Sequence, residues 1–580
     1  MKRAYPAILI ALLVVSLPAL AQVKPKPAPK PAIPPAATPA KPAPKPAPAA
    51  ESPVDAFLKT RALEQAYNPV LVNYLLEEGR PKLTPAQHKL AMDQIVARFK
   101  AEVDVKPSSQ IAASLSTVVG ALAGGVVGEG VATGAGSVWA AWVDAANLLV
   151  RAGYPEDAMP FLENCVKTNP YPVLRSRCTV GLAAANPERA LTILTGLVDK
   201  SQPEEVINTS LRMLGDLAGT EDYPAAHKDA AVKELVARTQ GMMNTVYYVA
   251  AIDGLARSKD PRGVEPIRKL TGATKGTEVQ RAAKRALLID FKDPAIVEVL
   301  RKDAKGGFMK TDDDKFYAGA LLIEAGDDAG FAYAKEQLTK KQGGFLSSKN
   351  QVDYRPDLVR ILVTYGGQKA VPVLQAGLAA RKSDEWLRAF TAIGLLELGD
   401  TTGMDDARKA LTVQEWANTR MRATEALAKH GDLSGVAVLK TMVQNPGTLK
   451  KFLDLIGGKA GDRDALCASI AGSLGRINHP DSVPVLTSLI GDGSDQVRLA
   501  AAYAVADMTD PSALDAYAPA LAADYGKDEG RTRTPDVAAH LLRTASVRFP
   551  GDPRTRTLLT QASKSEMPTV RFLALVASRP

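Results

Sequence analysis

The chain has 580 residues, of which 46% are hydrophobic, 23% are charged and 5% are aromatic. It is too long for one compact core and too apolar for a disordered chain, so the bulk folds as several domains or as one repetitive array. Its three cysteines exclude a disulfide-built scaffold and a multi-cysteine zinc domain.

The formal charge of +9 is concentrated at the amino-terminal end. Lys2 and Arg3 contribute +2 and five further lysines before Glu51 contribute +5, which leaves +2 for residues 51–580. Binding to DNA or RNA rests on clustered Lys and Arg side chains that contact phosphates. The nearly neutral body therefore argues against nucleic acid as a partner.

Residues 1–21 have the pattern of a secretory signal peptide. Its charged start, apolar stretch and small-x-small cleavage site are Lys2-Arg3, Ile8 to Leu17 and Ala19-Leu20-Ala21. An uncleaved anchor helix is disfavoured, because Pro18 interrupts a short apolar run and a membrane span needs ~20 residues. We therefore predict a periplasmic or secreted protein whose signal peptide is cleaved after Ala21.

Residues 22–53 form a linker that is rich in Lys, Pro and Ala and is predicted to be disordered. Residues 24–50 contain eleven prolines and five lysines, and resemble the Lys-Pro spacers of envelope proteins such as TonB-like transducers. Because proline lacks an N–H and fixes φ, we expect an extended spacer of roughly 80 Å at ~3.1 Å per residue. The lysines either keep a solvated linker soluble or weakly contact anionic cell-wall or membrane groups.

Two segments precede the main part of the chain: an N-terminal helical region over residues 54–106 and a Gly/Ala-rich apolar segment and cap over residues 107–150. Residues 107–128 carry no charge, and Gly120, Gly124 and Gly128 stand four apart, a spacing that lets apolar helices touch in membranes. Residues 111–128 are therefore a candidate membrane contact. The density of glycine and the nearby Glu129 favour instead a glycine-rich segment that leads into the amino-terminal cap of the repeats.

From residue 151 to residue 580 a pattern of about 32 residues recurs. Its marker is a turn that follows one helical stretch and precedes a shorter one, and successive turns can be 33, 32 or 31 residues apart. The turns are Asn186-Pro187, Asp260-Pro261, Asp293-Pro294, Asp327-Asp328, Gly399-Asp400, Gly431-Asp432, His479-Pro480 and Asp510-Pro511. Proline suits the first position of a helix, and Asp495 is expected to cap a first helix.

These repeats resemble the HEAT family, in particular the short HEAT-like repeats named from phycobilisome lyases. The resemblance is carried by Asp495, Val497, Arg498, Ala501 and Ala504, with Val483, Pro484 and Leu486 in the preceding repeat. It implies an all-α solenoid in which the arginines of the pattern bond acidic residues of neighbouring repeats. The ladder residues implied in this way are Arg388, Arg422, Asp495 and Arg498. Members of the family act as scaffolds or adaptors and occasionally as lyases.

No residue pattern indicates catalysis, a cofactor or a metal. The five histidines show no ligand spacing, and neither a nucleophile elbow nor a phosphate-binding loop is present. Cys165 and Cys178 flank a short turn, so they either form a disulfide or are two small core residues that never meet. Cys467 is left over and is expected to be buried.

A row of basic residues lies at the ends of second helices. If those helices line the concave side, the row meets an acidic partner; otherwise the cations only complement helix C-termini. The row consists of Arg268, Lys269, Arg301, Lys302, Arg381, Lys382, Arg408 and Lys409.

The sequence therefore predicts a non-catalytic periplasmic or secreted HEAT-repeat scaffold, without a cofactor, that binds a protein partner along its concave surface. Two alternatives remain open. One is an envelope structural protein that associates with the membrane through residues 111–128. The other is a lyase-type enzyme built on the repeats.

Overall fold

The computed structural model confirms the predicted all-α solenoid. Its described part is helical apart from one antiparallel pair of two-residue strands, β1 (Lys527–Asp528) and β2 (Arg531–Thr532). The described residues are 51–65, 68–104, 135–169, 171–199, 201–221, 223–240, 244–272, 276–306, 310–340, 353–380, 384–413, 417–445, 447, 449, 460–528 and 531–579.

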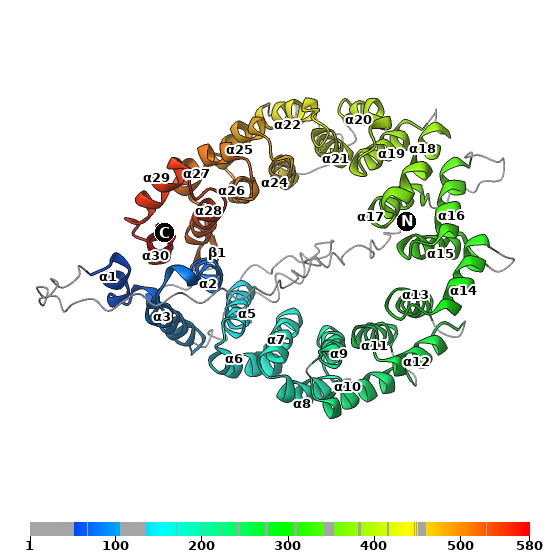
Figure 1. Cartoon of the computed structure of the whole chain (residues 1–580), viewed down its shortest axis with the longest axis horizontal. Helices are drawn as coiled ribbons and strands as arrows, with labels where there is room; N and C mark the ends of the chain where they lie inside the picture. Colours follow the sequence, from blue (N-terminus) through cyan, green and yellow to red (C-terminus); the bar gives the residue numbers. More distant parts are fainter. Residues whose placement is uncertain are drawn as a thin grey trace, which may run out of the picture.

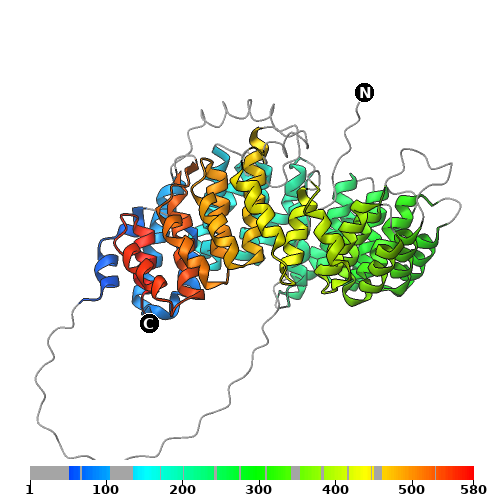
Figure 2. The same ribbon diagram turned by 90° about the horizontal axis from the view of Figure 1, so that it is seen from above.

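The helices form two layers that follow each other around the molecule (Figures 1 and 2). The inner layer consists of α5 (Ala135–Arg151), α7 (Pro172–Ala185), α9 (Glu204–Gly219), α11 (Thr245–Ser258), α13 (Thr277–Arg285), α15 (Asp312–Glu324), α17 (Arg355–Tyr365), α19 (Glu385–Glu397), α21 (Ala417–Ala428), α24 (Ala460–Ile477), α26 (Asp495–Asp507), α28 (Thr534–Arg548) and α30 (Pro568–Ala577). The outer layer consists of α6 (Pro155–Thr168), α8 (Pro187–Leu197), α10 (Ala225–Arg238), α12 (Val264–Lys269), α14 (Pro294–Lys305), α16 (Asp328–Thr339), α18 (Val371–Ala380), α20 (Met404–Ala410), α22 (Ser434–Gln444), α25 (Val483–Ile490), α27 (Leu514–Ala522) and α29 (Pro553–Ala562).

Short helical turns connect or extend these helices. They are η1 (Ala62–Gln65), η2 (Arg80–Lys82), η3 (Pro261–Gly263), the π-helical η4 (Ala286–Asp290), η5 (Gly367–Ala370), η6 (Thr401–Gly403), η7 (Pro480–Ser482) and η8 (Pro511–Ala513).

In several repeats the recurring turn of the sequence caps the outer helix or the short turn that precedes it. The Asp293 carboxylate accepts a hydrogen bond from the Ala295 N–H at 3.0 Å, and Asp327 accepts one from Ala329 at 3.0 Å. Pro294 occupies the first position of α14, where its missing N–H leaves no bond unmade. The expected cap at Asp495 is wrong, because Ser494 stands at the N-cap position and Asp495 is the first helical residue of α26.

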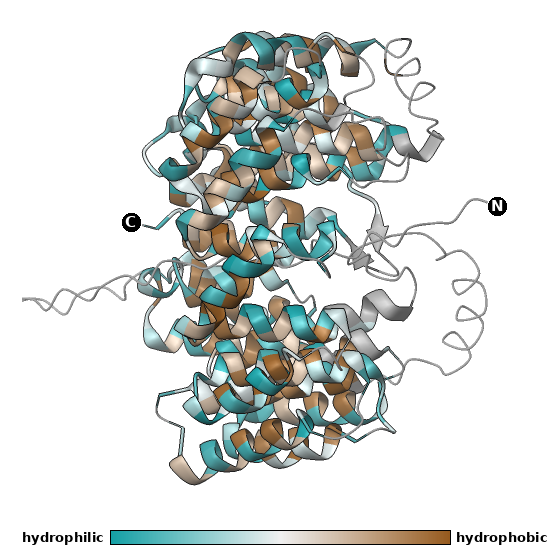
Figure 3. Cartoon of the chain, turned by 90° about the vertical axis from the view of Figure 1, so that its right-hand side faces the viewer, coloured by the Kyte–Doolittle hydropathy of each residue, from teal (hydrophilic) through white to brown (hydrophobic). Residues whose placement is uncertain are grey.

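Hydrophobic and hydrophilic residues alternate along the ribbons in Figure 3, and most of the buried residues are hydrophobic. A close backbone contact in the inner layer joins α9 and α11, where a Cβ added at Gly215 would lie 2.6 Å from the Gly254 Cα. No larger residue fits there without displacing a backbone. These repeats therefore stack by the close approach of small residues.

The solenoid closes on itself. Helices α1 (Pro53–Lys59), α2 (Pro69–Leu76) and α3 (Pro85–Asp104), which we call the closing unit, lie between the carboxyl-terminal helices and the first repeat (Figure 1). Helix α2 contacts α28 on one side and α5 on the other, and one hydrophobic core contains residues from both ends of the chain. The inner layer therefore continues into the closing unit, and the molecule is a ring.

The contacts of the closing unit with α28 and α30 form what we call the closing seam. The rings of Phe57 and Phe572 stack with centroids 5.1 Å apart. Arg543 pairs with Glu77 and Glu78, each at 2.7 Å. The Lys82 ammonium donates to the Ala577 carbonyl at 2.9 Å and to the Arg579 carbonyl at 2.7 Å.

On its other side the closing unit meets α5 and α6 through aromatic rings and one ion pair. The ring of Phe161 lies 5.8 Å from that of Phe99 and 6.0 Å from that of Trp139, between centroids. Lys100 pairs with Asp157 beside them. Both junctions of the closing unit thus contain apolar and charged contacts.

Within the residues that the structure describes, no helix has the length and apolar character needed to span a bilayer. The candidate membrane contact at 111–128, the signal peptide and the Lys/Pro-rich linker lie outside the described residues.

Candidate interaction surface

A groove of about 720 Å³ opens on the inner layer between α21 and α24, beside α26. We call it the inner groove. Its lining residues are Met421, Arg422 and Glu425 from α21, Ala465, Ala468, Ser469, Gly472, Ser473 and Arg476 from α24, and Gln496 from α26. The volume lies within the ~300–1,000 Å³ range of ligand pockets.

The sequence of α24 explains why this helix presents a shallow polar floor. Ala465, Ala468, Gly472 and Arg476 follow the spacing of one helical face, while Leu466, Ile470 and Leu474 on the opposite face are buried. The exposed face therefore points away from the outer helices and toward the inside of the ring. Its small side chains leave the backbone of α24 close to any bound segment.

Charged pairs frame the inner groove. The Arg476 guanidinium donates to a Glu425 carboxylate oxygen at 2.7 Å, and the Ser473 hydroxyl donates to the same oxygen at 2.6 Å. The hydrogen bond to Glu425 raises the pKa of Arg476 above its usual range, so this side chain stays charged. The side chain of Arg476 is 63% exposed. Its guanidinium can therefore also contact a bound partner.

The ladder residues implied by the family resemblance take three different arrangements. Arg422 donates to Glu397 of the neighbouring inner helix at 2.7 Å, which is a bond between repeats. Arg388 bonds Asp406 of its own helix pair at 2.5 Å.

Arg498 pairs with Asp495 of the same helix, so this pair joins no repeats, and its other hydrogen bonds go to carbonyls. The ion pair thus runs between repeats at Arg422, within one helix pair at Arg388 and within one helix at Arg498. Arg388 also donates to the Leu378 carbonyl of the preceding helix α18 at 3.1 Å.

The described members of the basic row lie on outer helices, so the premise that second helices line the concave side is wrong (Figure 1). Its arginines form a ladder of their own, which we call the outer ladder: Arg268 bonds Asp293 at 2.8 Å, Arg301 bonds Asp327 at 2.7 Å, and Arg408 bonds Asp432 at 2.6 Å. In each pair the acid belongs to the turn before the next outer helix.

Among the lysines of the row, Lys409 pairs with Asp406 at 3.1 Å, whereas Lys269 and Lys302 are exposed. Arg381 and Lys382 lie outside the described residues.

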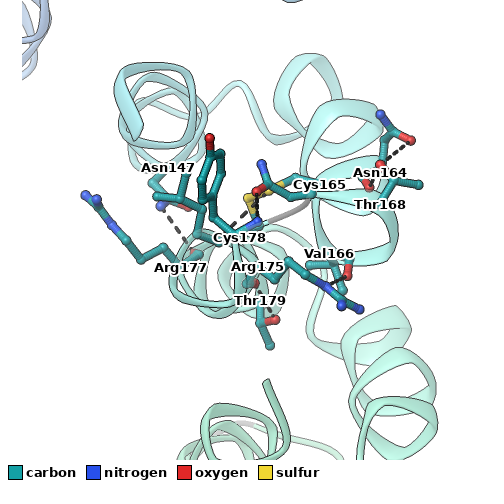
Figure 4. Close-up of a disulfide and its surroundings, with 12 residues drawn as sticks. Asn147, Asn164, Cys165, Val166, Thr168, Arg175, Arg177, Cys178 and Thr179 are labelled. Atoms are coloured by element: carbon teal, nitrogen blue, oxygen red, sulfur yellow. Dashed lines mark hydrogen bonds between the residues drawn. A yellow bond between two sulfur atoms is a disulfide. The ribbon is translucent and has the colours of Figure 1, made fainter. Parts of the chain in front are cut away.

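Cys165 and Cys178 form a disulfide that joins α6 to α7 (Figure 4). Their Cα atoms are 6.2 Å apart and both side chains are buried. Because α6 also carries Phe161 and Asp157, the disulfide ties α7 to a helix that the closing unit contacts. Cys467 is free and buried, and burial raises the pKa of its thiol.

The histidines lie in structural contacts. His88 and His430 bond the backbone carbonyls of Leu75 and Leu396, at 3.1 and 2.8 Å. His479 caps η7, and the rings of His227 and His540 pack against tyrosines. In the described part of the chain, no group of three or more His, Cys, Asp or Glu side chains is placed to hold a metal ion.

Sequence reasoning missed the inner groove and the closing seam. The signal for the inner groove was present in α24, as small and polar residues spaced along one face between two repeats. For the closing seam no comparable signal exists, because Glu77, Glu78 and Arg543 are more than 460 residues apart and follow no repeating pattern.

Residues 459–532, which include all of α24 to α27, match the family model described as HEAT repeats. Residues 459–532 are HEAT repeats. The prediction of this family is confirmed, and the matched HEAT segment contributes α24 and Gln496 to the inner groove.

Several solved structures resemble the α-solenoid of this chain at low identity. Yeast importin-beta (Kap95p) is 13% identical, with 87% of this chain and 72% of that chain covered and a TM-score of 0.35. UNC-45 from Drosophila melanogaster is 12% identical, with coverages of 90% and 80% and a TM-score of 0.26. Human deoxyhypusine hydroxylase is 14% identical, with coverages of 55% and 96% and a TM-score of 0.21. No curated protein matches the chain.

Proposed function

We propose that this protein is a non-catalytic scaffold of the periplasm or the cell exterior that binds a protein partner along the inner layer of its ring. The inner groove is the observation that carries the proposal. It is an opening of about 720 Å³ whose walls combine small apolar residues with exposed hydrogen-bonding groups.

The chemistry of the inner groove suits a peptide segment. Ala468 and Gly472 leave space for a partner's backbone, and Met421 offers a flexible apolar surface at one side. Ser469 and Gln496 supply neutral donors and acceptors, and Arg476 supplies an exposed guanidinium. A groove of this kind recognises a peptide segment through several contacts that are distributed along its length.

The proposed location rests on the signal-peptide pattern of residues 1–21, and the disulfide between Cys165 and Cys178 supports it. Disulfides persist in oxidising compartments such as the periplasm and the exterior. Fractionation of cells that express the full chain tests this point. The mature protein is expected in the periplasm or the medium, with Gln22 as its first residue.

Photo-crosslinking in intact cells tests the partner. A photoreactive amino acid is placed at Ser469, on the inner groove, or at Thr560, which is exposed on the outer helix α29. We expect one reproducible protein to be linked to position 469 and not to position 560. Adding Ala465→Trp, which fills the inner groove, should abolish the link.

The proposal fails if positions 469 and 560 link the same proteins, or if neither links any protein. It also fails if Ala465→Trp leaves the link unchanged, because the contact would then lie elsewhere. Thermal melting of each variant confirms that the ring is folded.

A further inference from the structure

The outer layer contains a second opening, between α16 and α18, which we call the outer slot. It has a volume of about 330 Å³ and is lined by Asp328, Phe331, Ala332, Lys335, Lys369, Pro372 and Val373. It lies on the opposite layer from the inner groove, so a segment bound in the outer slot and one bound in the inner groove would be independent of each other.

The floor of the outer slot is apolar. Phe331 is 7% exposed and its ring lies beneath the Lys369 ammonium, which is 5.7 Å from the ring centroid. Pro372 and Val373 of α18 face it, and Ala332 is exposed beside it. An apolar floor of this size accommodates one large apolar side chain and gains free energy when that side chain leaves water.

The rim of the outer slot carries an excess of positive charge. Lys369 is held at one end by the Asp328 carboxylate at 3.0 Å and by the Gly326 carbonyl at 3.1 Å. Lys335 lines the slot one helical turn beyond Phe331 and forms no ion pair within the described residues, although the exposed Glu336 is its neighbour in sequence. The lining therefore contains two ammonium groups and one carboxylate.

The neighbouring outer helices carry further exposed lysines, while their exposed acids Glu265 and Glu298 pair with Arg268 and Arg301. Arg268 and Arg301 are paired with acids in the outer ladder, whereas Lys269, Lys302 and Lys305 are exposed without an ion pair in the described part of the chain. Because α12, α14 and α16 are successive outer helices of the same layer, these lysines lie toward corresponding ends of their helices. The ladder thus neutralises the arginines and leaves the lysines for other contacts.

We propose that the outer slot is a docking site for an acidic segment of a partner protein that inserts one large apolar side chain between α16 and α18. The apolar side chain covers Phe331, Pro372 and Val373. Acidic residues on either side of it pair with Lys335 and with the lysines of α14. The observation that decides the class of partner is the combination of an apolar floor with a cationic rim.

An anionic polymer or a lipid surface satisfies only half of this arrangement. Phosphate or carboxylate groups would pair with the lysines but would leave the exposed apolar residues of the lining, Ala332 and Pro372, facing water. The net charge of residues 51–580 is only +2, which is too small for strong general attraction to polyanions. A peptide supplies both the apolar anchor and the carboxylates.

Fluorescence anisotropy with the full mature chain tests this inference. The probe is a short fluorescein-labelled peptide of aspartates and glutamates around one phenylalanine. Two control peptides carry alanine in place of the phenylalanine, or lysines in place of the acids. We expect Kd to rise by about tenfold or more for each control peptide relative to the probe.

Matched variants locate the site. Ala332→Trp, which fills the outer slot, and Lys335→Glu, which reverses the charge at its rim, should each raise Kd for the probe by about tenfold. Ala226→Trp on α10 and Lys564→Glu after α29 change exposed residues elsewhere on the ring and should leave Kd unchanged. Melting curves show that each variant is folded.

Several outcomes would overturn the inference. Equal binding of the phenylalanine and alanine peptides would mean that the apolar floor is not used. If Lys335→Glu and Lys564→Glu raised Kd equally, the binding would be explained by general charge attraction and not by the outer slot. Competition by polyphosphate at the same concentration as the unlabelled probe would favour an anionic polymer over a protein segment.

Discussion

The junction between α9 and α11 and the closing seam both contain apolar contacts, but they differ in what else joins the helices. At the α9–α11 junction two buried glycines bring the helix backbones together, and a Cβ at Gly254 would lie 2.5 Å from the Leu211 carbonyl oxygen. At the closing seam long side chains reach across: Arg543 to Glu77 and Glu78, and Lys82 to the carbonyl of Ala577.

This difference bears on how a repeat array becomes a ring. Within the array, the junctions join helices that share one sequence pattern, so their geometry follows from that pattern. The closing seam joins two segments that do not share the pattern, and charged side chains fix their register by pairing with particular partners. Packing therefore stabilises the array, while specific polar contacts decide where it closes.

The greatest loss of stability should come from breaking the close α9–α11 junction. Gly215→Ala places a methyl group against the backbone of α11 and should lower the free energy of unfolding by about 2 to 3 kcal/mol. Gly196→Ala in α8 is the matched control, because a Cβ there meets nothing within 4 Å. That control should stabilise by ~0.5–1 kcal/mol through helix propensity. Urea unfolding measures both, and equal effects would show that the junction tolerates a larger residue.

A smaller loss is expected at the closing seam. Arg543→Ala removes the cation between Glu77 and Glu78 and should cost about 1–2 kcal/mol. Hydrogen exchange should become faster in α2 and α28 while α9 and α11 stay protected. Arg238→Ala, which removes an ion pair inside α10, is the control and should leave the exchange of α2 unchanged. Faster exchange throughout the ring would contradict a local seam.

The outer ladder should make the array sensitive to acid. The hydrogen bond from Arg268 lowers the pKa of Asp293, and that from Arg301 lowers the pKa of Asp327. Because these folded-state pKa values are depressed, their stabilisation is complete above the unfolded value of about 3.9 and is lost as pH falls through the folded values.

Urea midpoints measured from pH 7 down to pH 3 should therefore fall below about pH 4. Asp327→Asn should lower the midpoint at pH 7 and flatten this fall. A midpoint independent of pH would show that the ladder does not contribute.

The weakest effect should be that of removing one exposed member of the same ladder. Arg301→Ala leaves the Asp327 cap of α16 in place, since that carboxylate still accepts from the Ala329 N–H. We expect a change in melting temperature within about 2 °C, as for other exposed ion pairs. If Arg301→Ala lowered the melting temperature more than Arg543→Ala does, polar contacts would matter more within the array than at the closing seam.

The repeating part of the fold was readable in the sequence because its causes are local. Asp293 and Pro294 cap and begin a helix wherever they occur together, and the apolar stripe around Val497 and Ala501 sets which side is buried. The side of the ring on which the second helices lie was not readable, because both layers of the pattern are amphipathic.

The inner groove and the closing seam required coordinates. The distance between α21 and α24 depends on how two complete helices pack, and no single residue of α24 indicates it. The partners Phe57 and Phe572 are ordinary buried aromatics in the sequence, and only the closure of the ring brings them together.

Closure also removes the free ends from which a stacked array usually unravels. In an open solenoid the terminal repeats have a neighbour on one side only, so they fray first and need special capping units. Here the first and last repeats both abut the closing unit, which serves the two ends at once. Melting of this protein should consequently begin at an internal junction and proceed with a sharper transition than the number of its repeats would suggest.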